Sequence, residues 1–424
     1  IFPISSGWTT SNLHAGQFSA ACGVTIHRGH GLPAAFHGNA FTCDPTGNLV
    51  HRQQLVRSGP AYSSLLNSST REFLASSHDW FRPVALADGP DGCLYVIDMA
   101  RAVIEHPQFM PDELKNRPDL LHGRSRGRLW RIAAADRQPA PPAAALAAAT
   151  DQQLVALLAH PNGWHRDTAS RLLLERSDRL PREDLQTLAL EGPTAESRSR
   201  ALWLLAAAAR QQHTAHQHSR SPLDETLLAA ALRDPDPRVR GVAVQVSSLQ
   251  PAASEIIRSR LLEMAADPDP RVRYRIALRL GEPDLQAAPN TEQAVATALA
   301  NLLAHDPADP WTRRAVATSA SGRAASVLTS LLPQLAVSAA SPTTRSVCVQ
   351  QFAELAAAEG HADALAAVVQ ELAAAITGVA ADDAATLPPA FACLTGIGQG
   401  LARQRQHLDA ALAGWPPAMQ TAVI

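Results

Sequence analysis

One short motif occurs twice and sets the architecture of the second half of the chain. It reads Asp234-Pro-Asp-Pro-Arg-Val-Arg240 and again Asp267-Pro-Asp-Pro-Arg-Val-Arg273. Arginines continue the series at intervals of 32 to 40 residues, at Arg166, Arg200, Arg240, Arg273, Arg313 and Arg345. A self-similar period in this range is typical of stacked helix pairs, each of which buries its apolar face only against its neighbours. The sequence therefore predicts an all-α solenoid over residues 151–424.

The residues around the first motif predict two helices joined by a proline turn. The helix before the turn has an apolar stripe at helical spacing, formed by Leu227, Leu228, Ala231 and Leu232. The Asp-Pro step ends it, because proline disfavours helical geometry in the residue before it. Asp236 followed by Pro237 then matches an N-cap with proline at the first helical position. Each repeat is thus predicted to be a helical hairpin.

This pattern resembles HEAT repeats, whose turn reads Asp-Pro-x-Val-Arg. The resemblance implies that the turn aspartates and the arginines form ladders between neighbouring repeats, so that the arginines are structural. It also implies protein partners, because a solenoid of this kind offers an extended surface for binding.

Residues 1–132 have a different character. Short apolar runs such as Ala40–Cys43, Leu94–Ile97 and Arg128–Ile132 are separated by glycine, proline and asparagine turns, which predicts β-strands. A Pro-Asp-Gly turn followed by a strand that ends in aspartate, at Gly89–Asp98, is typical of β-propeller blades. About 130 residues supply roughly two or three blades. We therefore expect the C-terminal blades of a propeller here, further blades upstream of Ile1, and an Ala/Pro-rich linker over residues 133–150.

Several longer segments of this region resemble planctomycete-type membrane-bound dehydrogenases. In that family a sorbosone/glucose-dehydrogenase-like propeller precedes HEAT repeats and often a cytochrome c domain. The segments are Arg28-Gly-His-Gly-Leu-Pro33, Gly38 to Arg52, Glu72 to Val84, Gly89 to Asp98 and Val103-Ile-Glu-His-Pro107. The resemblance implies an extracytoplasmic enzyme that oxidises a sugar or alcohol at pyrroloquinoline quinone (PQQ), with calcium, and passes electrons to a cytochrome.

The chain departs from that family in two ways. The early blades that carry the family's catalytic histidine are missing, and so is the Cys-x-x-Cys-His that attaches haem c. We therefore expect an internal fragment that is inactive by itself and has no assignable catalytic residue. A non-enzymatic scaffold that recognises a protein or a glycan is the alternative function, because fold alone does not choose between the two.

Two residues are candidates for cofactor binding. Arg82, in Trp80-Phe-Arg-Pro-Val84, matches the family's Arg-Pro-Val strand start, and a guanidinium suits the carboxylates of a quinone. Its structural alternative is a strand cap or a pair with Asp79. Asp98 could hold calcium or line the channel, but an aspartate that ends a strand more often accepts hydrogen bonds from the following turn.

Other residues favour no metal site and no catalytic pair. The five cysteines include no Cys-x-x-Cys motif, so they predict neither a zinc site nor haem attachment. Three histidines at 213, 216 and 218 could bind a transition metal, yet the polar residues beside them favour a loop. Glu105 and His106 are adjacent on an extended segment, so that they point to opposite faces.

Charge and hydropathy exclude two classes of partner. The formal net charge is −2, Lys115 is the only lysine, and the arginines are interspersed with acidic residues. Nucleic acid is therefore not expected to bind. No apolar run approaches the roughly 20 residues that a membrane-spanning helix needs.

Overall fold

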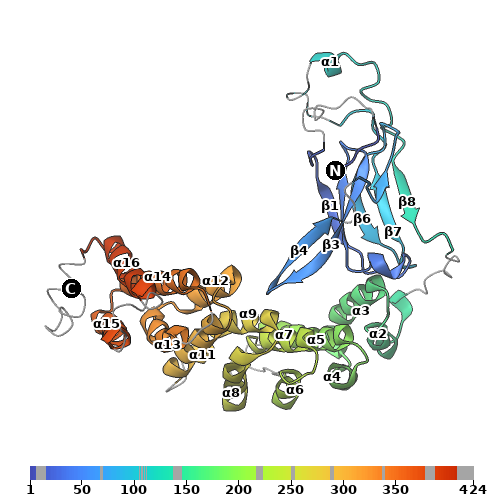
Figure 1. Ribbon diagram of the computed structural model, residues 1–424. Helices are drawn as coiled ribbons and strands as arrows, with labels where there is room; N and C mark the ends of the chain where they lie inside the picture. The colour runs from blue at the N-terminus through green and yellow to red at the C-terminus, as the bar shows by residue number, and fades with distance from the viewer. Residues whose placement is uncertain are drawn as a thin grey trace. The chain divides into compact units, whose positions relative to one another are not determined.

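A computed structural model describes most of the chain as two compact units. The described residues are 1–5, 16–66, 70–104, 106, 108, 110, 112–136, 146–215, 223–249, 254–286, 291–336, 340–377 and 387–407. The first unit comprises Ile1–Ser58 and Tyr62–Asp184, and the second comprises Gly59–Ala61 and Leu185–Ile424. Strands gather in the first unit and helices make up the second (Figure 1).

Two antiparallel sheets form the body of the first unit, as the turn-rich sequence predicts. One contains β1 (Cys22–Ile26), β2 (Ala40–Asp44), β3 (Leu49–Ser58) and β4 (Ala61–Leu66) in that order, with β5 (Leu74–Ala75) beside β3. The other contains β6 (Pro83–Asp88), β7 (Leu94–Asp98) and β8 (Arg128–Ile132) in that order. The short helix α1 (Asp112–Lys115) lies between β7 and β8 in sequence.

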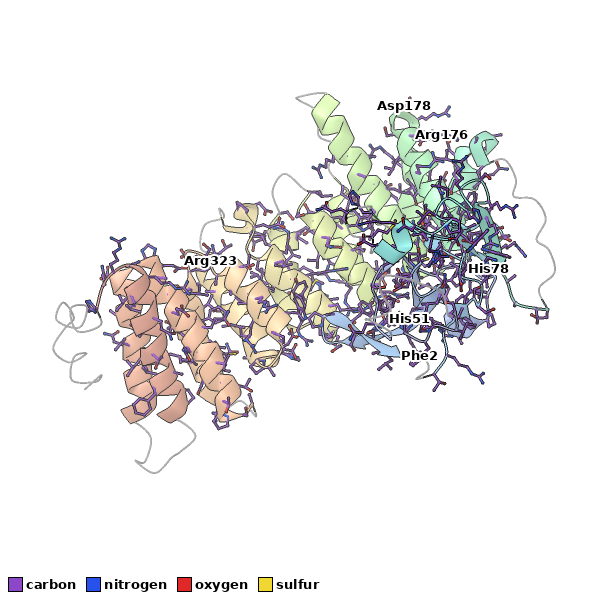
Figure 2. All side chains as sticks on the ribbon, turned by 90° about the horizontal axis from the view of Figure 1, so that it is seen from above. Phe2, His51, His78, Arg176, Asp178 and Arg323 are labelled. Atoms are coloured by element: carbon purple, nitrogen blue, oxygen red, sulfur yellow. The ribbon has the colours of Figure 1, made fainter. Side chains whose placement is uncertain are left out.

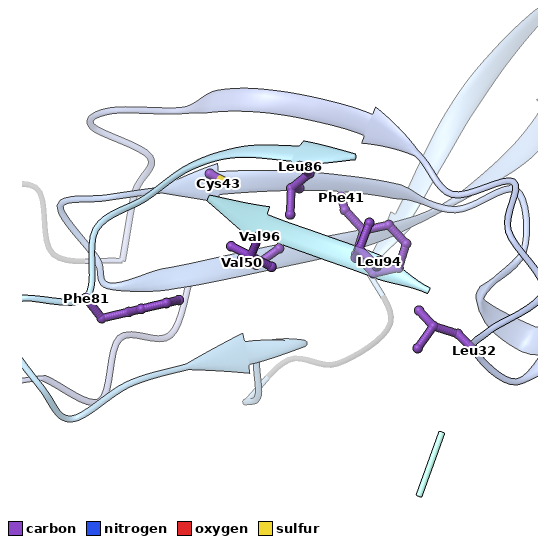
Figure 3. Packing of buried hydrophobic residues seen from close by; sticks show 8 residues of the cluster. All are labelled: Leu32, Phe41, Cys43, Val50, Phe81, Leu86, Leu94 and Val96. Atoms are coloured by element: carbon purple, nitrogen blue, oxygen red, sulfur yellow. The ribbon is translucent and has the colours of Figure 1, made fainter. Parts of the chain in front are cut away.

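The core of this unit lies between the two sheets. Side chains alternate along each strand, so Phe41 and Cys43 of β2 point inward together. Thr25 ties the sheets at the same place, because its hydroxyl donates to the Leu86 carbonyl at 3.0 Å. Figure 3 shows eight buried members of the cluster, which are Leu32, Phe41, Cys43, Val50, Phe81, Leu86, Leu94 and Val96.

The first helical hairpin belongs to the sheet unit. Helices α2 (Asp151–Leu157) and α3 (Gly163–Glu175) both precede Asp184, where that unit ends. The compact unit therefore extends past the linker predicted at 133–150. The physical reason is a set of polar contacts between α3 and two loops of the sheets, described below.

The remaining helices form stacked pairs, which confirms the prediction of a solenoid-like second half. First and second helices of the pairs alternate along the chain, and the second helices α5, α7, α9 and α12 pack side by side (Figure 1). The helices are α4 (Arg182–Glu191), α5 (Ala195–Ala215), α6 (Glu225–Ala231), α7 (Pro237–Ser247), α8 (Glu255–Glu263), α9 (Pro270–Arg279), α10 (Pro283–Gln286), α11 (Glu292–His305), α12 (Pro310–Ser319), α13 (Ala324–Ala336), α14 (Pro342–Glu359), α15 (Ala362–Thr377) and α16 (Leu387–Arg403).

The predicted proline turns are present. Asp236 caps α7 by accepting a hydrogen bond from the Arg238 backbone at 2.8 Å, and Pro237 is the first helical residue. Asp269 and Pro270 repeat this arrangement at α9. The cap satisfies a backbone donor that the helix itself leaves unpaired. None of the helices in the described ranges is long and apolar enough to cross a membrane.

Candidate functional site

Arg82 is buried at the start of β6, and its guanidinium binds the chain itself. Nε donates to the Arg101 carbonyl at 3.0 Å, Nη1 to the Pro45 carbonyl at 2.7 Å and Nη2 to the Ala102 carbonyl at 2.8 Å. Burial lowers the pKa of this guanidinium. All three nitrogens thus tie loops of the two sheets together, which is the geometry of a structural arginine.

Asp98, at the end of β7, is buried and accepts four hydrogen bonds. Oδ1 accepts from the backbone N–H of Arg82 at 2.9 Å and of Ala100 at 2.8 Å. Oδ2 accepts from Nε of Arg128 at 2.8 Å and from Nε1 of Trp130 at 2.9 Å. Both oxygens are therefore occupied by donors of the chain, and the two separately predicted candidates meet through the backbone N–H of Arg82. The geometry favours the structural alternative for each.

Most of the other candidates lie beyond the part of the chain that the structure describes. His216, His218 and Glu105 lie outside the described residues, and so does the side chain of His213. Within the described part of the chain, no group of three or more His, Cys, Asp or Glu side chains is arranged to hold a metal ion.

Asn162, which the sequence did not mark as important, joins the first helical hairpin to the sheets. Its side chain is buried, and Oδ1 caps α3 by accepting from the Trp164 backbone at 3.0 Å. Its amide Nδ2 donates to the carbonyls of Gly89 at 2.9 Å and Pro90 at 3.1 Å. One side chain thus both begins the helix and docks it on the turn before β7. The signal was present in the sequence: this turn has Asn-Gly where the regular repeats have Asp-Pro.

Further contacts hold the same junction. The backbone of Gly163 donates to the Arg28 carbonyl at 2.9 Å, and the guanidinium of Arg28 forms two hydrogen bonds with the carboxylate of Asp167. The ring of His160 lies 4.2 Å from that of His165 and 6.0 Å from that of His30. Burial and these two neighbours lower the pKa of His160, so its neutral ring accepts the backbone N–H of Asn162.

Two buried histidine–carboxylate pairs stabilise the sheets. His27 Nδ1 lies 2.5 Å from Asp88 Oδ1, and His51 Nδ1 lies 2.7 Å from Glu72 Oε2. Figure 2 labels His51 and Phe2, both of which contact Glu72. Burial raises the pKa of Glu72, but the hydrogen bonds from His51 and Phe2 outweigh this and lower it. The Nε2 atoms of both histidines are buried without a partner in the described structure.

In the helical unit, an aspartate–arginine ladder joins neighbouring pairs. Arg240 donates two hydrogen bonds to Asp267, at 2.7 and 2.8 Å, and Arg273 binds Asp306 in the next pair. Such two-pronged bonds between charged groups fix orientation as well as distance. The ladder implied by the HEAT resemblance is therefore present.

Two members of the predicted arginine series, Arg200 and Arg345, do not share the ladder's contacts. Arg198, not Arg200, binds the turn aspartate Asp234 at 2.8 and 2.9 Å. One hydrogen bond identifies which arginine belongs to the ladder. In each case Nη1 donates to the backbone carbonyl of the residue six positions earlier. Arg166, Arg198, Arg240, Arg273 and Arg313 share this bond. Arg345 instead binds the Leu335 carbonyl. The sequence Arg198-Ser-Arg200 offers two arginines, and only the helix phase distinguishes them.

The outward-facing side chains of the second helices α5, α7, α9 and α12 form one surface across the stack. We call it the second-helix face and define it by Glu196, Arg200, Trp203, Arg238, Val242, Gln245, Arg271, Arg275, Leu278, Trp311, Arg314 and Thr318. Contacts between helices hold the rows in register: Arg238 binds Glu196, Arg275 lies against Gly241, and Ser319 lies beside Leu278. The face is therefore a property of the stack, not of one helix.

Large apolar side chains remain exposed on this face. The exposed fraction is 42% for Trp203, 40% for Leu278 and 45% for Trp311. Arg314 lies over the Trp311 ring, with its guanidinium carbon 5.4 Å from the ring centre. Exposed aromatic and arginine side chains are enriched in protein interfaces, where both bury large areas.

Comparison with known families supports this division of the chain. Residues 1–136 match a family described as a domain of unknown function (DUF7133), and residues 224–322 match HEAT repeats. The second match covers the regular Asp-Pro turns and the ladder between them. No curated protein matches the chain.

Proposed function

We propose that the chain is a binding scaffold whose protein partner is bound on the second-helix face. The observation that supports the proposal best is the exposure of Trp203, Leu278 and Trp311 on helices whose apolar side chains are mostly buried. HEAT repeats are a general architecture for protein–protein contact, because the stack presents one side of many helices at once.

The ladder makes this surface suitable for recognition. Arg198, Arg240 and Arg273 each bind an aspartate of the next helix pair, so neighbouring second helices keep a fixed spacing. A surface that is rigid before binding loses little conformational entropy in the complex. The scaffold is thus pre-organised for a partner that spans several repeats.

Site-specific photocrosslinking tests the scaffold. A photoreactive residue in place of Gln245, at the centre of the second-helix face, is expected to capture a discrete protein in the source cells. The matched control replaces Glu263, which is exposed on the first helix α8. The captured protein, once identified and purified, is expected to bind the chain and to bind a Trp203→Ala variant at least about tenfold more weakly. Equal capture from both positions would contradict the proposal.

We also propose that the two sheets are neighbouring blades of a β-propeller. They pack face to face, and both outer faces carry exposed apolar side chains: Val24 and Ile26 on one, Ile97 and Leu129 on the other. In a closed ring each of these faces would be covered by a further blade. A structure of a longer product of the same gene tests this. A third sheet on either face supports the propeller, and two solvent-exposed faces contradict it.

The dehydrogenase role implied by family resemblance stays a prediction. PQQ, calcium, a cytochrome partner, a sugar substrate and an extracytoplasmic location all follow from that resemblance. The resemblance assigns cofactor binding to Arg82 and Asp98, yet both side chains are used within the fold. Arg82 ties loops of the two sheets together, and Asp98 ties β7 to β8. The geometry therefore favours the scaffold as the function of this chain.

A further inference from the structure

Two cysteines lie directly opposite each other on neighbouring strands of the first sheet. Cys22 of β1 is the register partner of Cys43 of β2 in their antiparallel pairing. Residues that face each other in this way have Cα atoms about 4.5–5.5 Å apart. Disulfides usually join cysteines whose Cα atoms are about 4.4–6.8 Å apart, so the spacing of the two strands already suits a disulfide.

A β-bulge in β1 brings the two side chains onto the same face of the sheet. The register shifts between Cys22 and Thr25, and Gly23 has a φ of 59°, in the left-handed region that glycine adopts readily. The Thr25 side chain faces β6, so strict alternation would place Cys22 on the outer face with the exposed Val24 and Ile26. The extra residue of the bulge turns Cys22 inward instead.

Both thiols therefore face the space between the sheets. Cys43 is fully buried in the core (Figure 3), and Cys22 packs against that core with its Sγ 4.0 Å from the carbonyl oxygen of Pro83 in β6. Both are free thiols in the structure. Burial raises the pKa of both, that of Cys43 to about 12, and the neighbouring Cys22 adds to the shift at Cys43.

From this arrangement we infer that Cys22 and Cys43 form a dithiol site, which a small-molecule disulfide such as glutathione disulfide oxidises to a cross-strand disulfide. The bond joins β1 covalently to β2 at the place where β1 also meets β6. It lies in the sheet unit, so the inference is independent of the scaffold function proposed for the helical unit.

Thiol–disulfide exchange forms this bond in two steps. Cys22 is the more exposed of the two thiols; it loses its proton, and its thiolate attacks one sulfur of the small disulfide, which gives a mixed disulfide and releases one small thiolate. Cys43 then loses its proton, and its thiolate attacks Sγ of Cys22 and releases the second small thiolate. The two protons end on the two released thiols. The cysteines are thus oxidised and the small disulfide is reduced.

Refolding in a glutathione redox buffer tests whether the bond forms. The full chain is unfolded with reductant, refolded with reduced and oxidised glutathione, and alkylated in denaturant before peptide mapping by mass spectrometry. A Cys22–Cys43 linkage is expected in most molecules, at least about tenfold more often than any other pairing of the five cysteines. Alkylation of both Cys22 and Cys43 in most refolded molecules, or linkages without preference, would overturn the inference.

Exchange in the folded chain tests the order of the two steps. The raised pKa values keep both thiols protonated at neutral pH, so reaction with glutathione disulfide is expected to be slow there and faster toward about pH 9. Cys43→Ala is expected to stop with glutathione on Cys22, and Cys22→Ala is expected to leave Cys43 unmodified. Circular dichroism shows whether both variants fold. Equal modification of the two variants would contradict the assigned order.

Thermal stability gives a readout that needs no variant. The bond closes a loop of about 20 residues, and it is expected to raise the Tm of the sheet unit by about 5–10 °C over the reduced chain. The matched control is Cys93→Ala, which removes a buried cysteine of the same unit and is expected to keep this difference between the oxidised and reduced forms. Cys22→Ala is expected to abolish it. A difference that persists in Cys22→Ala would assign the effect to another cysteine and overturn the inference.

Discussion

Replacing Asp98 with alanine is expected to lower the free energy of unfolding of the sheet unit by about 3–5 kcal/mol in calcium-free buffer. The reason is that two backbone N–H groups, Arg128 and Trp130 all donate to this one buried carboxylate. Without it, buried donors lose their partners. Denaturant unfolding followed by tryptophan fluorescence measures the change, since Trp130 itself contacts Asp98.

The matched control is Asp79→Ala. Asp79 is exposed in the segment before β6, so its removal is expected to change the stability by no more than about 0.5 kcal/mol. Calcium provides the second readout. If Asp98 were a calcium ligand, the ion would stabilise the natural chain but not the variant, and the variant would lose little without calcium. That pattern would restore the cofactor role implied by the family resemblance.

The second large effect is expected at Arg279, a buried arginine of the helical unit. Arg279 is 2% exposed; its Nε donates to Ser247 Oγ at 2.9 Å, and its guanidinium binds both oxygens of Asp284 at 2.7 and 2.6 Å. Arg279→Met leaves Asp284 without this partner. The expected loss is about 3–5 kcal/mol, because breaking a buried ion pair leaves one charge uncompensated. Thermal and denaturant unfolding followed by circular dichroism measures it.

Arg323 is the matched comparison. It is 8% exposed, but its Nε and Nη1 atoms are buried without a hydrogen-bond partner among the described residues. Methionine removes this unsatisfied charge and keeps a side chain of similar length. We expect Arg323→Met to leave the stability unchanged or to raise it. Equal losses for the two variants would show that packing of the arginine stems, rather than the ion pair, determines the effect.

The fold was predicted best where its causes are local. The Asp236-Pro237 cap and the apolar stripe before it lie within a few residues of each other, and both helices of that pair formed as expected. The short apolar runs Ala40–Cys43, Leu94–Ile97 and Arg128–Ile132, each bounded by turn residues, likewise predicted strands of the two sheets. Short-range patterns of this kind can be recognised without knowledge of the partner element.

The candidate site was predicted less well, because its contacts join distant parts of the chain. Arg82 and Asp98 were each recognised as candidates, but their roles depend on carbonyls and donors at Pro45, Ala102 and Trp130. The Asn-Gly step at Asn162 marked an irregular turn, but it did not reveal the role of the side chain. The partners of Asn162 are two backbone carbonyls in the turn before β7, and backbone carbonyls carry no sequence signature.

The sequence by itself determined the repeat, its proline turns and the division into a strand-rich and a helical part. These features depend on dihedral preferences and on hydrophobic periodicity, both of which act over a few residues. Tertiary structure decided that Arg198 and not Arg200 belongs to the ladder, that the first hairpin joins the sheets, and that arginines and tryptophans of four helices form one face. Each of these depends on which side chains meet after the helices pack, and helix phase and distance in space are set only by the assembled core.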